Sequence, residues 1–145
     1  MDTRKQKGFT FIEILIVVVI ISILAAIIGP RLIGRTYEAR KTAAKQQIAN
    51  LETALKLFKI DNGFYPSTDQ GLEALVSKPA TGRIPTRFRE EGYLEKKSVP
   101  LDPWGRPYVY ISPGLHGDYD IISYGADGEE GGEGNDADIT SWTIE

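Results

Sequence analysis

The chain lacks cysteine altogether, and its 145 residues include a single histidine, His116. Without cysteine, the chain can form neither a disulfide framework nor a thiolate zinc site. One histidine leaves few groups for acid–base catalysis, and Ser123 lies in IISYG, not in the G-x-S-x-G elbow of hydrolases. The net charge of −3 at pH 7 argues against nucleic acid as a partner, because nucleic-acid binders usually carry a basic surface. We therefore expect that the chain is not an enzyme.

A long apolar run occupies residues 9–30, and between Ile14 and Gly29 its only polar residue is Ser22. As a helix, this run would be about 33 Å long, enough to cross the hydrocarbon core of a membrane. The run is apolar on all sides, which disfavours a helix buried by one face in a globular core. A secretory signal cleaved after SILAA and a retained anchor both fit. The preceding basic residues would keep the amino terminus in the cytoplasm; they are Arg4, Lys5 and Lys7.

Glu13 introduces a carboxylate near the start of this run. An acidic residue costs on the order of 3 kcal/mol at the centre of a spanning helix and less near its end. Glu13 therefore either lies at the membrane interface or has a partner inside the membrane, and nothing basic lies within the run. Cleavage after Gly8 would make Phe9 the first residue. In a stack of identical chains, its α-amino group would pair with Glu13 of the next chain.

The segment KGFTFIEILIVVVIISILAAI, residues 7–27, resembles the class III signal of type IV pilins and type II secretion pseudopilins. It has the basic leader, the glycine, the phenylalanine and a glutamate four residues on, all opening an apolar run. The resemblance implies that a prepilin peptidase cuts between Gly8 and Phe9 on the cytoplasmic side, and that Phe9 is then N-methylated. Glu13 falls at the fifth position of the mature chain, where the family has its glutamate.

One helix is expected to run from about Phe9 to about Ile60. Pro30 predicts a kink, because proline lacks a backbone donor and clashes with the preceding turn. Beyond it, apolar residues recur at helical spacing and predict one apolar stripe packed on the chain's own domain; they are Tyr37, Ala44, Ile48, Leu51, Leu55 and Phe58. Gly63 follows as a left-handed cap.

The remaining residues predict a small antiparallel sheet laid on the amphipathic part of that helix, an α+β fold. Ser67 or Thr68 is expected to cap a short helix that runs through Val76, and residues 80–107 read as an ordered loop. Within that loop, residues 102–105 form the turn signature Asp-Pro-Trp-Gly, and we expect Trp104 to cover the core. Strands are predicted at residues 108–111 and 119–124, with a third at 140–144.

An acidic, glycine-rich segment follows, GADGEEGGEGNDADI at residues 125–139, with six acids and no base. One interpretation is a solvated acidic loop. The other is a Ca²⁺ site, because carboxylates and loop carbonyls are the hard oxygen ligands that Ca²⁺ takes. The spacing is not that of an EF-hand. A metal would then stabilise this end of the chain, where no disulfide can.

Several stretches outside the apolar run are similar to the major pseudopilins of type II secretion, among them YPSTDQGLEALV, DPWGRPYVYISPGLHGDYDIISYGADG and ADITSW. The resemblance implies that Asp127 and Asp138 are calcium ligands, together with the main-chain carbonyls of Tyr124 and Glu129. Asp136 lies where the loop length varies in the family and is a further candidate ligand.

The resemblance implies a structural subunit with three parts: a cytoplasmic leader over residues 1–8, which is removed, a transmembrane and filament-core helix over residues 9–30, and a periplasmic part over residues 31–145. Many copies would polymerise from the inner membrane into a helical fibre, the pseudopilus, that pushes folded exoproteins through the outer membrane. The implied partners are further copies of the chain, minor pseudopilins, the prepilin peptidase, the inner-membrane assembly platform and, before assembly, membrane lipid.

Two alternatives stay open. A type IV pilus subunit shares the amino-terminal signal, but most such subunits close their carboxyl-terminal region with a disulfide that this chain cannot form. A monomeric, membrane-anchored domain that binds calcium would explain the acidic loop, but such a monomer has no need for Glu13.

Overall fold

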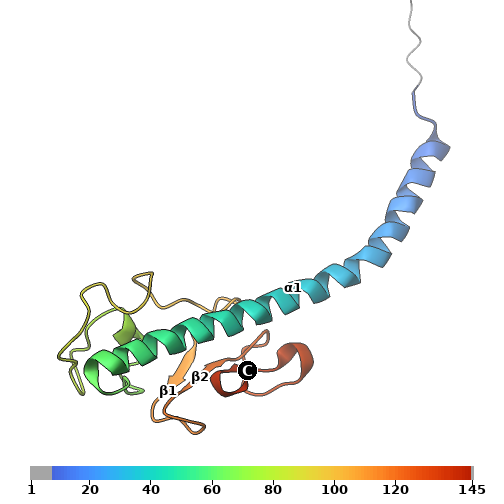
Figure 1. Cartoon of the computed structure of the whole chain (residues 1–145). Helices are drawn as coiled ribbons and strands as arrows, with labels where there is room; N and C mark the ends of the chain where they lie inside the picture. The colour runs from blue at the N-terminus through green and yellow to red at the C-terminus, as the bar shows by residue number, and fades with distance from the viewer. Residues whose placement is uncertain (1–7, 145) are drawn as a thin grey trace, which may run out of the picture. The chain divides into compact units, whose positions relative to one another are not determined.

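The computed structural model describes residues 8–144 of the chain, with the backbone alone for residues 28–35. Its elements follow in the order α1 (Phe11–Asn62), η1 (Leu72–Leu75), β1 (Val109–Ile111), β2 (Asp120–Ser123), η2 (Gly134–Asp136), β3 (Ile139–Thr140) and η3 (Ser141–Thr143), where η marks a 3-10 helix. The chain divides into two compact units between Glu38 and Ala39, and α1 contributes to both (Figure 1).

Helix α1 is 52 residues long and passes through Pro30 without interruption. The predicted helix is thereby confirmed, although it begins and ends two residues later than expected. Pro30 does not end the helix, and the kink expected there stays a prediction. After Asn62, the amide of Gly63 donates to the carbonyl oxygen of Lys59 at 2.7 Å, and Gly63 has a φ of 83°. This is the left-handed cap that the sequence predicts.

The first unit presents apolar side chains on every side of its helix. Between Ile12 and Ile27 the large apolar side chains have exposed fractions of 48–59%. Since these values are even around the helix, no apolar stripe is buried between Ile12 and Ile27.

Among the residues that the structure describes, no helix combines the length and the apolarity needed to cross a membrane.

In the second unit, the apolar stripe of α1 packs against a three-stranded antiparallel sheet, which lies along this part of the helix (Figure 1). Ile121 of β2 and Ile139 of β3 belong to the same buried cluster as the stripe and are at most 2% exposed. The predicted stripe is confirmed at five positions, each at most 1% exposed: Ala44, Ile48, Leu51, Leu55 and Phe58. Tyr37, the sixth predicted position, is only half-buried and lies in the first unit. The long helix on a small antiparallel sheet is therefore the fold that the sequence predicts.

The sheet has the order β1-β2-β3, with Tyr110 opposite Ile121 and Ser123 opposite Ile139. The first two strands lie where they are predicted. The third was predicted at residues 140–144, but β3 is only Ile139–Thr140, and the chain turns into η3 directly after it. The Thr143 hydroxyl donates to the carbonyl of Thr140 at 3.2 Å and so stabilises a helical turn in place of a longer strand.

The short helix predicted up to Val76 is also shorter than expected. Ser67 begins a turn, since its carbonyl accepts from the amides of Gln70 and Gly71, each at 3.0 Å. Gly71 then takes a φ of 62°, which is not helical, and η1 begins after it. The backbone of Gly71 therefore separates the turn from the helix, and no side chain caps η1.

The Asp-Pro-Trp-Gly turn forms as predicted. The Gly105 amide donates to the carbonyl of Asp102 at 2.9 Å, and Gly105 has a φ of 86°. The buried Asp102 carboxylate accepts from the amides of Trp104 at 3.0 Å and Arg106 at 2.8 Å, and from the Ser123 hydroxyl at 2.7 Å. The Trp104 side chain packs half-buried against the core, which confirms its predicted role as a cover.

Strand β1 is an edge of the sheet, and Thr68 contacts the chain just beyond its end. The Ser112 amide donates to the Thr68 hydroxyl at 2.9 Å, and the Thr68 amide donates to the Ser112 carbonyl at 3.3 Å. At this point, both backbone hydrogen-bonding groups of Ser112 are occupied from within the chain.

Replacing Leu55 by alanine is expected to lower the free energy of unfolding of the second unit by about 2–5 kcal/mol, because the fully buried leucine leaves a cavity in the core. Chemical denaturation followed by tryptophan fluorescence measures the change. The exposed neighbour Lys56 provides the control, since Lys56→Ala should alter stability by less than about 0.5 kcal/mol. Equal destabilisation by the two variants would show that the stripe does not hold this unit together.

Candidate functional site

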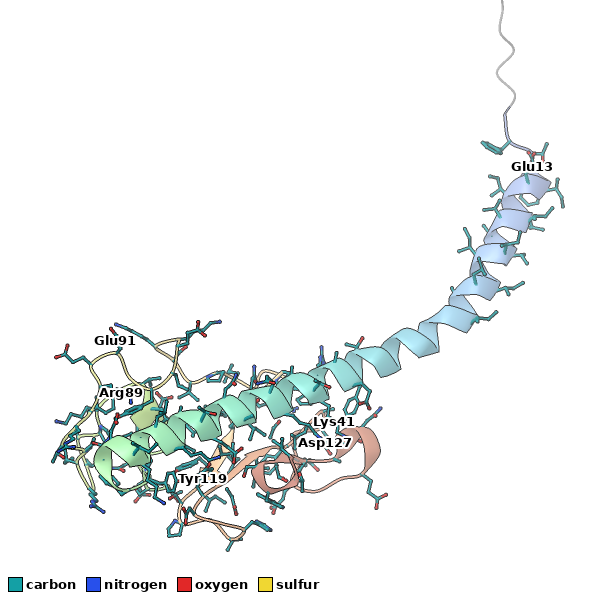
Figure 2. The ribbon with its side chains drawn as sticks, viewed as in Figure 1. Glu13, Lys41, Arg89, Glu91, Tyr119 and Asp127 are labelled. Atoms are coloured by element: carbon teal, nitrogen blue, oxygen red, sulfur yellow. The ribbon has the colours of Figure 1, made fainter. Side chains whose placement is uncertain are left out.

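Glu13 takes part in a reciprocal cap at the start of α1 (Figure 2). Its carboxylate accepts from the amide of Thr10 at 2.8 Å and from the Thr10 hydroxyl at 3.0 Å. In return, the Glu13 amide donates to the Thr10 hydroxyl oxygen at 3.3 Å. This is a capping box, in which two otherwise unpaired amides are satisfied. Thr10 was not among the residues predicted from the sequence, although the spacing T-x-x-E before an apolar helix is the known signal for a capping box.

The Gly8–Phe9 junction is accessible on the described side. Phe9 is 84% exposed, and a Cβ atom added to Gly8 would meet nothing within 4 Å. The fold itself therefore does not demand glycine at position 8. The leader residues 1–7, including Arg4, Lys5 and Lys7, lie outside the described residues.

The acidic loop begins with a turn centred on Asp127 (Figure 2). The Asp127 carboxylate accepts from the amide of Glu129 at 3.1 Å, and the amide of Gly128 donates to the carbonyl of Tyr124 at 3.1 Å. The predicted ligands Tyr124, Asp127 and Glu129 therefore lie in one tight turn. The charged loop is locally ordered here instead of fully solvated.

Asp138, at the other end of the loop, supplies the unusual feature of this region. Its Oδ2 atom accepts from the amide of Gly131 at 2.9 Å. Its Oδ1 atom is buried and has no hydrogen-bond partner within the described part of the chain. A buried carboxylate oxygen without a partner is costly, and natural proteins usually pair it with a donor, water or an ion.

The backbone of the loop approaches itself closely at two glycines. A Cβ atom on Gly125 would lie 2.9 Å from the carbonyl oxygen of Ala137, and one on Gly132 would overlap the carbonyl of Asp136. Both glycines also have positive φ values, 61° and 84°. Glycine is therefore needed at these two positions for the loop to close on itself.

Arg106 contacts this loop through its guanidinium, and it was not among the residues predicted from the sequence. Its Nη1 atom donates to the carbonyl of Gly125 at 2.9 Å, and its Nη2 atom donates to the carbonyl of Asp127 at 3.2 Å. The carbonyl of Ala126 accepts from both nitrogens at 3.3–3.4 Å. One guanidinium thus binds three successive carbonyls.

Within residues 8–144, no three acidic or histidine side chains cluster closely enough to hold a metal by themselves. A metal in this loop would therefore need main-chain oxygens besides carboxylates. The candidate ligand atoms are all oxygens, and the Oδ1 atom of Asp138 has no hydrogen-bond partner among the described residues, so the residues present fit a hard cation such as Ca²⁺. Asp136 is exposed in η2.

The lone histidine has a structural role. His116 Nδ1 lies 3.1 Å from Oδ2 of the buried Asp120, and its ring stacks on Trp142 with the centroids 3.7 Å apart. Asp120 also accepts from the amides of Leu115 and His116. The histidine therefore helps to hold the loop between β1 and β2, as expected for a histidine in a turn.

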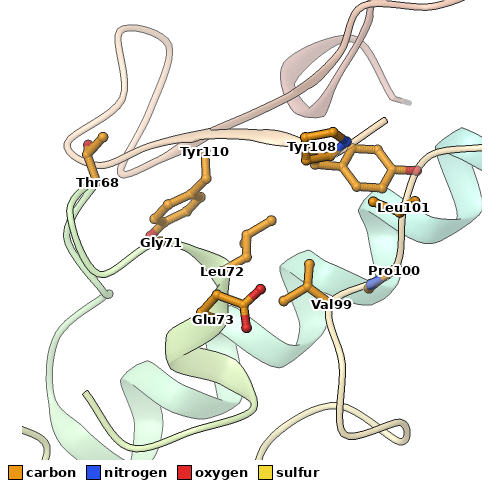
Figure 3. Close-up of a pocket in the computed structure, with 10 residues that line it drawn as sticks. Thr68, Gly71, Leu72, Glu73, Val99, Pro100, Leu101, Tyr108 and Tyr110 are labelled. Atoms are coloured by element: carbon orange, nitrogen blue, oxygen red, sulfur yellow. The ribbon is translucent and has the colours of Figure 1, made fainter. Parts of the chain in front are cut away.

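A cavity of about 300 Å³ lies between η1, β1 and the loop before β1 (Figure 3). Among the described residues that line it, Glu73 is the only carboxylate, and Tyr108 and Tyr110 are the other ionisable residues. The Tyr110 hydroxyl donates to the carbonyl of Pro66 at 2.8 Å, and burial raises the pKa of Tyr110 to about 12. Burial raises the pKa of Tyr108 as well. This lining offers no nucleophile with an adjacent base.

Residues 31–142 match the family described as type II secretion system (T2SS), protein G, and residues 3–29 match the prokaryotic N-terminal methylation motif. The chain belongs to the protein G family of the type II secretion system. Members of this family are structural pseudopilins, so the chain is a structural subunit of the pseudopilus and is not an enzyme. The family predicted from the residues is confirmed, and the type IV pilus alternative is disfavoured.

Curated members of the protein G family resemble the chain over nearly its whole length. The type II secretion system core protein G of Pseudomonas aeruginosa is 51% identical over 142 residues, which cover 98% of this chain and 99% of that protein. The protein of the same name from Vibrio cholerae is also 51% identical, with 98% and 95% covered.

Among solved structures, the major pseudopilin from the type 2 secretion system of enterohaemorrhagic Escherichia coli is similar, with a TM-score of 0.69 and 38% identity. The match covers 79% of this chain and 92% of that one.

Because some of its tyrosines are buried, the protein is expected to lose stability at high pH. Burial raises the pKa of Tyr110 from its ordinary value of 10.0 to about 12. The contribution of Tyr110 to stability is therefore complete below pH 10 and is lost as the pH rises toward about 12. Phenolate absorbance and near-ultraviolet circular dichroism, recorded together, should show the last tyrosines ionising as the fold is lost. Ionisation of all seven tyrosines near pH 10 with the dichroism unchanged would contradict this prediction.

Proposed function

We propose that this subunit polymerises with further copies of itself into a helical fibre that grows from the inner membrane and pushes folded proteins through the outer membrane. The observation that carries the proposal is the half of α1 between Ile12 and Ile27, whose apolar side chains are exposed on every side within their own unit. A continuous apolar surface of this kind needs cover. Membrane lipid would cover it before assembly, and the same half-helix of neighbouring subunits would cover it in the fibre.

Residues 9–30 would accordingly be the membrane anchor, with the amino terminus in the cytoplasm and residues 31–145 in the periplasm. The motif match over residues 3–29 supports processing by a prepilin peptidase between Gly8 and Phe9, followed by N-methylation of Phe9. Minor pseudopilins and the inner-membrane assembly platform would be further partners of the growing fibre.

Glu13 would be the residue that distinguishes the free subunit from the assembled one. In the free subunit its carboxylate is satisfied by Thr10 of the same chain. In the fibre, it would pair with the methylated α-amino group of Phe9 on a neighbouring subunit. The cap makes Glu13 less costly in the membrane, and the charge remains available for a stronger partner. A monomeric calcium-binding domain would have a use for the helix cap that Glu13 forms, but not for the negative charge of its carboxylate.

We also propose that the acidic loop binds Ca²⁺. Asp127 and Asp138 would provide carboxylate ligands, and Tyr124 and Glu129 main-chain carbonyls; Asp136 is a further candidate. The unpartnered Oδ1 atom of Asp138 supports this set, because it is a buried anionic oxygen without a donor within the described residues. The bound ion would supply charge neutralisation and fix the loop in one conformation.

The variant Glu13→Gln separates the charge from the cap. Glutamine still forms a capping box, so membrane insertion should be at least as efficient as in the wild type. Each contact between subunits would lose about 1–2 kcal/mol, because an amide binds an ammonium group less tightly than a carboxylate does. Fibre yield and secretion should therefore fall about tenfold or more.

Ser22 provides the matched control, because it is the only polar residue between Ile14 and Gly29 and its hydroxyl donates to its own helix, to the carbonyl of Val18 at 2.7 Å. Ser22→Ala should form fibres in normal amounts. Normal fibres from the Glu13→Gln variant would refute the pairing between subunits.

Chelation of calcium should lower the melting temperature of the second unit. An ion at 100 times its dissociation constant adds about 2.7 kcal/mol to the stability of a protein that binds it only when folded. Asp138→Asn should abolish the response to calcium, whereas Glu133→Gln removes the same charge from an exposed position of the loop and should keep it. Calorimetry of the wild type that gives one melting temperature in calcium and in chelator would remove the basis for the site.

A further inference from the structure

We infer that Arg106 is a positioning residue for the acidic loop: its guanidinium keeps residues 125–129 in the conformation that receives calcium, even when no ion is bound. The part of this inference that concerns calcium binding rests on the calcium site proposed above. The part that concerns the order of the loop does not. The cation in question is the Arg106 guanidinium, which donates hydrogen bonds to carbonyl oxygens of the loop.

The contact has the geometry of a clamp. Arg106 donates to the carbonyl oxygens of residues 125–127 at 2.9–3.4 Å, using both terminal nitrogens. Three carbonyls of successive residues converge on one group only if the backbone between them is curled. The planar fork of arginine can bind several acceptors at once, which the single ammonium of lysine does less well.

The backbone of Arg106 is itself fixed by the core. Its amide donates to the buried Asp102 carboxylate at 2.8 Å, and its carbonyl accepts from the Asp102 amide at 2.7 Å. The same carboxylate accepts from the Ser123 hydroxyl in β2. The guanidinium therefore extends from a rigid turn tied to the sheet and is not a mobile surface side chain.

Gly128 provides independent evidence that the guanidinium belongs where it lies. A Cβ atom at this position would overlap Cζ of Arg106, and Gly128 has a φ of 76°. The absence of a side chain at residue 128 thus lets the guanidinium lie directly against the loop backbone.

The carbonyls bound by Arg106 differ from those proposed for calcium. Arg106 binds the carbonyls of Gly125, Ala126 and Asp127, whereas the proposed ion uses those of Tyr124 and Glu129. The amides of Gly128 and Glu129 are also satisfied in the same turn. The first half of the loop is therefore ordered by protein contacts. In the second half, glycines at 131, 132 and 134 make the ordering cost high, and calcium would add to the hydrogen bond between the Gly131 amide and Asp138.

Arg106 could also have the opposite effect on calcium affinity, because a guanidinium near a calcium site repels the ion. The two effects predict opposite changes when the charge is removed. If positioning prevails, Arg106→Gln weakens calcium binding; if repulsion prevails, it strengthens it. Arg106→Lys keeps the charge but loses the fork, and under our inference it behaves like Arg106→Gln.

The first experiment measures hydrogen exchange of the full chain in detergent micelles with chelator present. In Arg106→Gln and Arg106→Lys, exchange of the amides of Gly128 and Glu129 should rise roughly tenfold over the wild type. The core amide of Ile121 reports on global folding and should not change. Arg87→Gln removes the same charge from an exposed loop elsewhere in the second unit and provides the control. Equal exchange at residues 128 and 129 in the wild type and in Arg106→Gln would overturn the inference.

The second experiment titrates calcium into the same four proteins by calorimetry. Both Arg106 variants should bind calcium about tenfold or more weakly than the wild type. Substituting a residue that positions metal ligands typically lowers the affinity for the metal by this amount. Tighter binding by Arg106→Gln would overturn the inference in favour of repulsion. A wild type that binds no calcium would refute the proposed metal site, whereas the exchange measurement in chelator would still decide whether Arg106 orders the loop.

Discussion

The contact between the apolar stripe of α1 and the sheet is the interaction on which the second unit depends. Four side chains of the stripe are completely or almost completely buried: Ile48, Leu51, Leu55 and Phe58. Each of the three strands contributes a residue to the same buried cluster. The strands are only two to four residues long, so the hydrogen bonds of the sheet are too few to keep it folded unless it packs against the helix. The helix therefore serves as the second layer of the fold as well as the connection to the amino-terminal unit.

A polar network extends that core toward the acidic loop. Asp102, buried beside Ser123, joins the turn that carries Arg106 to strand β2. Arg106 in turn reaches the carbonyls of residues 125–127. Between Gly128 and Asp136 the loop contains no apolar side chain that could dock it on the core. The order of the loop thus derives from the core through two charged residues, one at the base of the network and one at its end.

The elements that sequence reasoning predicted correctly are those that local patterns specify: the helical spacing of the stripe, the turn at residues 102–105 and the cap at Gly63. The errors have physical causes. Gly71 interrupts a helix that propensity alone would extend, and the carbonyl of Thr140 is taken by Thr143, which shortens the third strand. Arg106 was missed because its contacts join residues about twenty positions apart, and nothing in the sequence indicates which arginine reaches the loop.

The contacts between Thr68 and Ser112 have a consequence for a protein that must polymerise without aggregating. In a protein that assembles with further subunits, an open strand edge would let neighbouring sheets join in cross-β stacks. At the end of β1, the amide and carbonyl of Ser112 are already occupied by Thr68. A neighbouring strand therefore finds no free backbone groups at Ser112 to continue the ladder. Such local protection favours reversible association through side chains over irreversible association through the backbone.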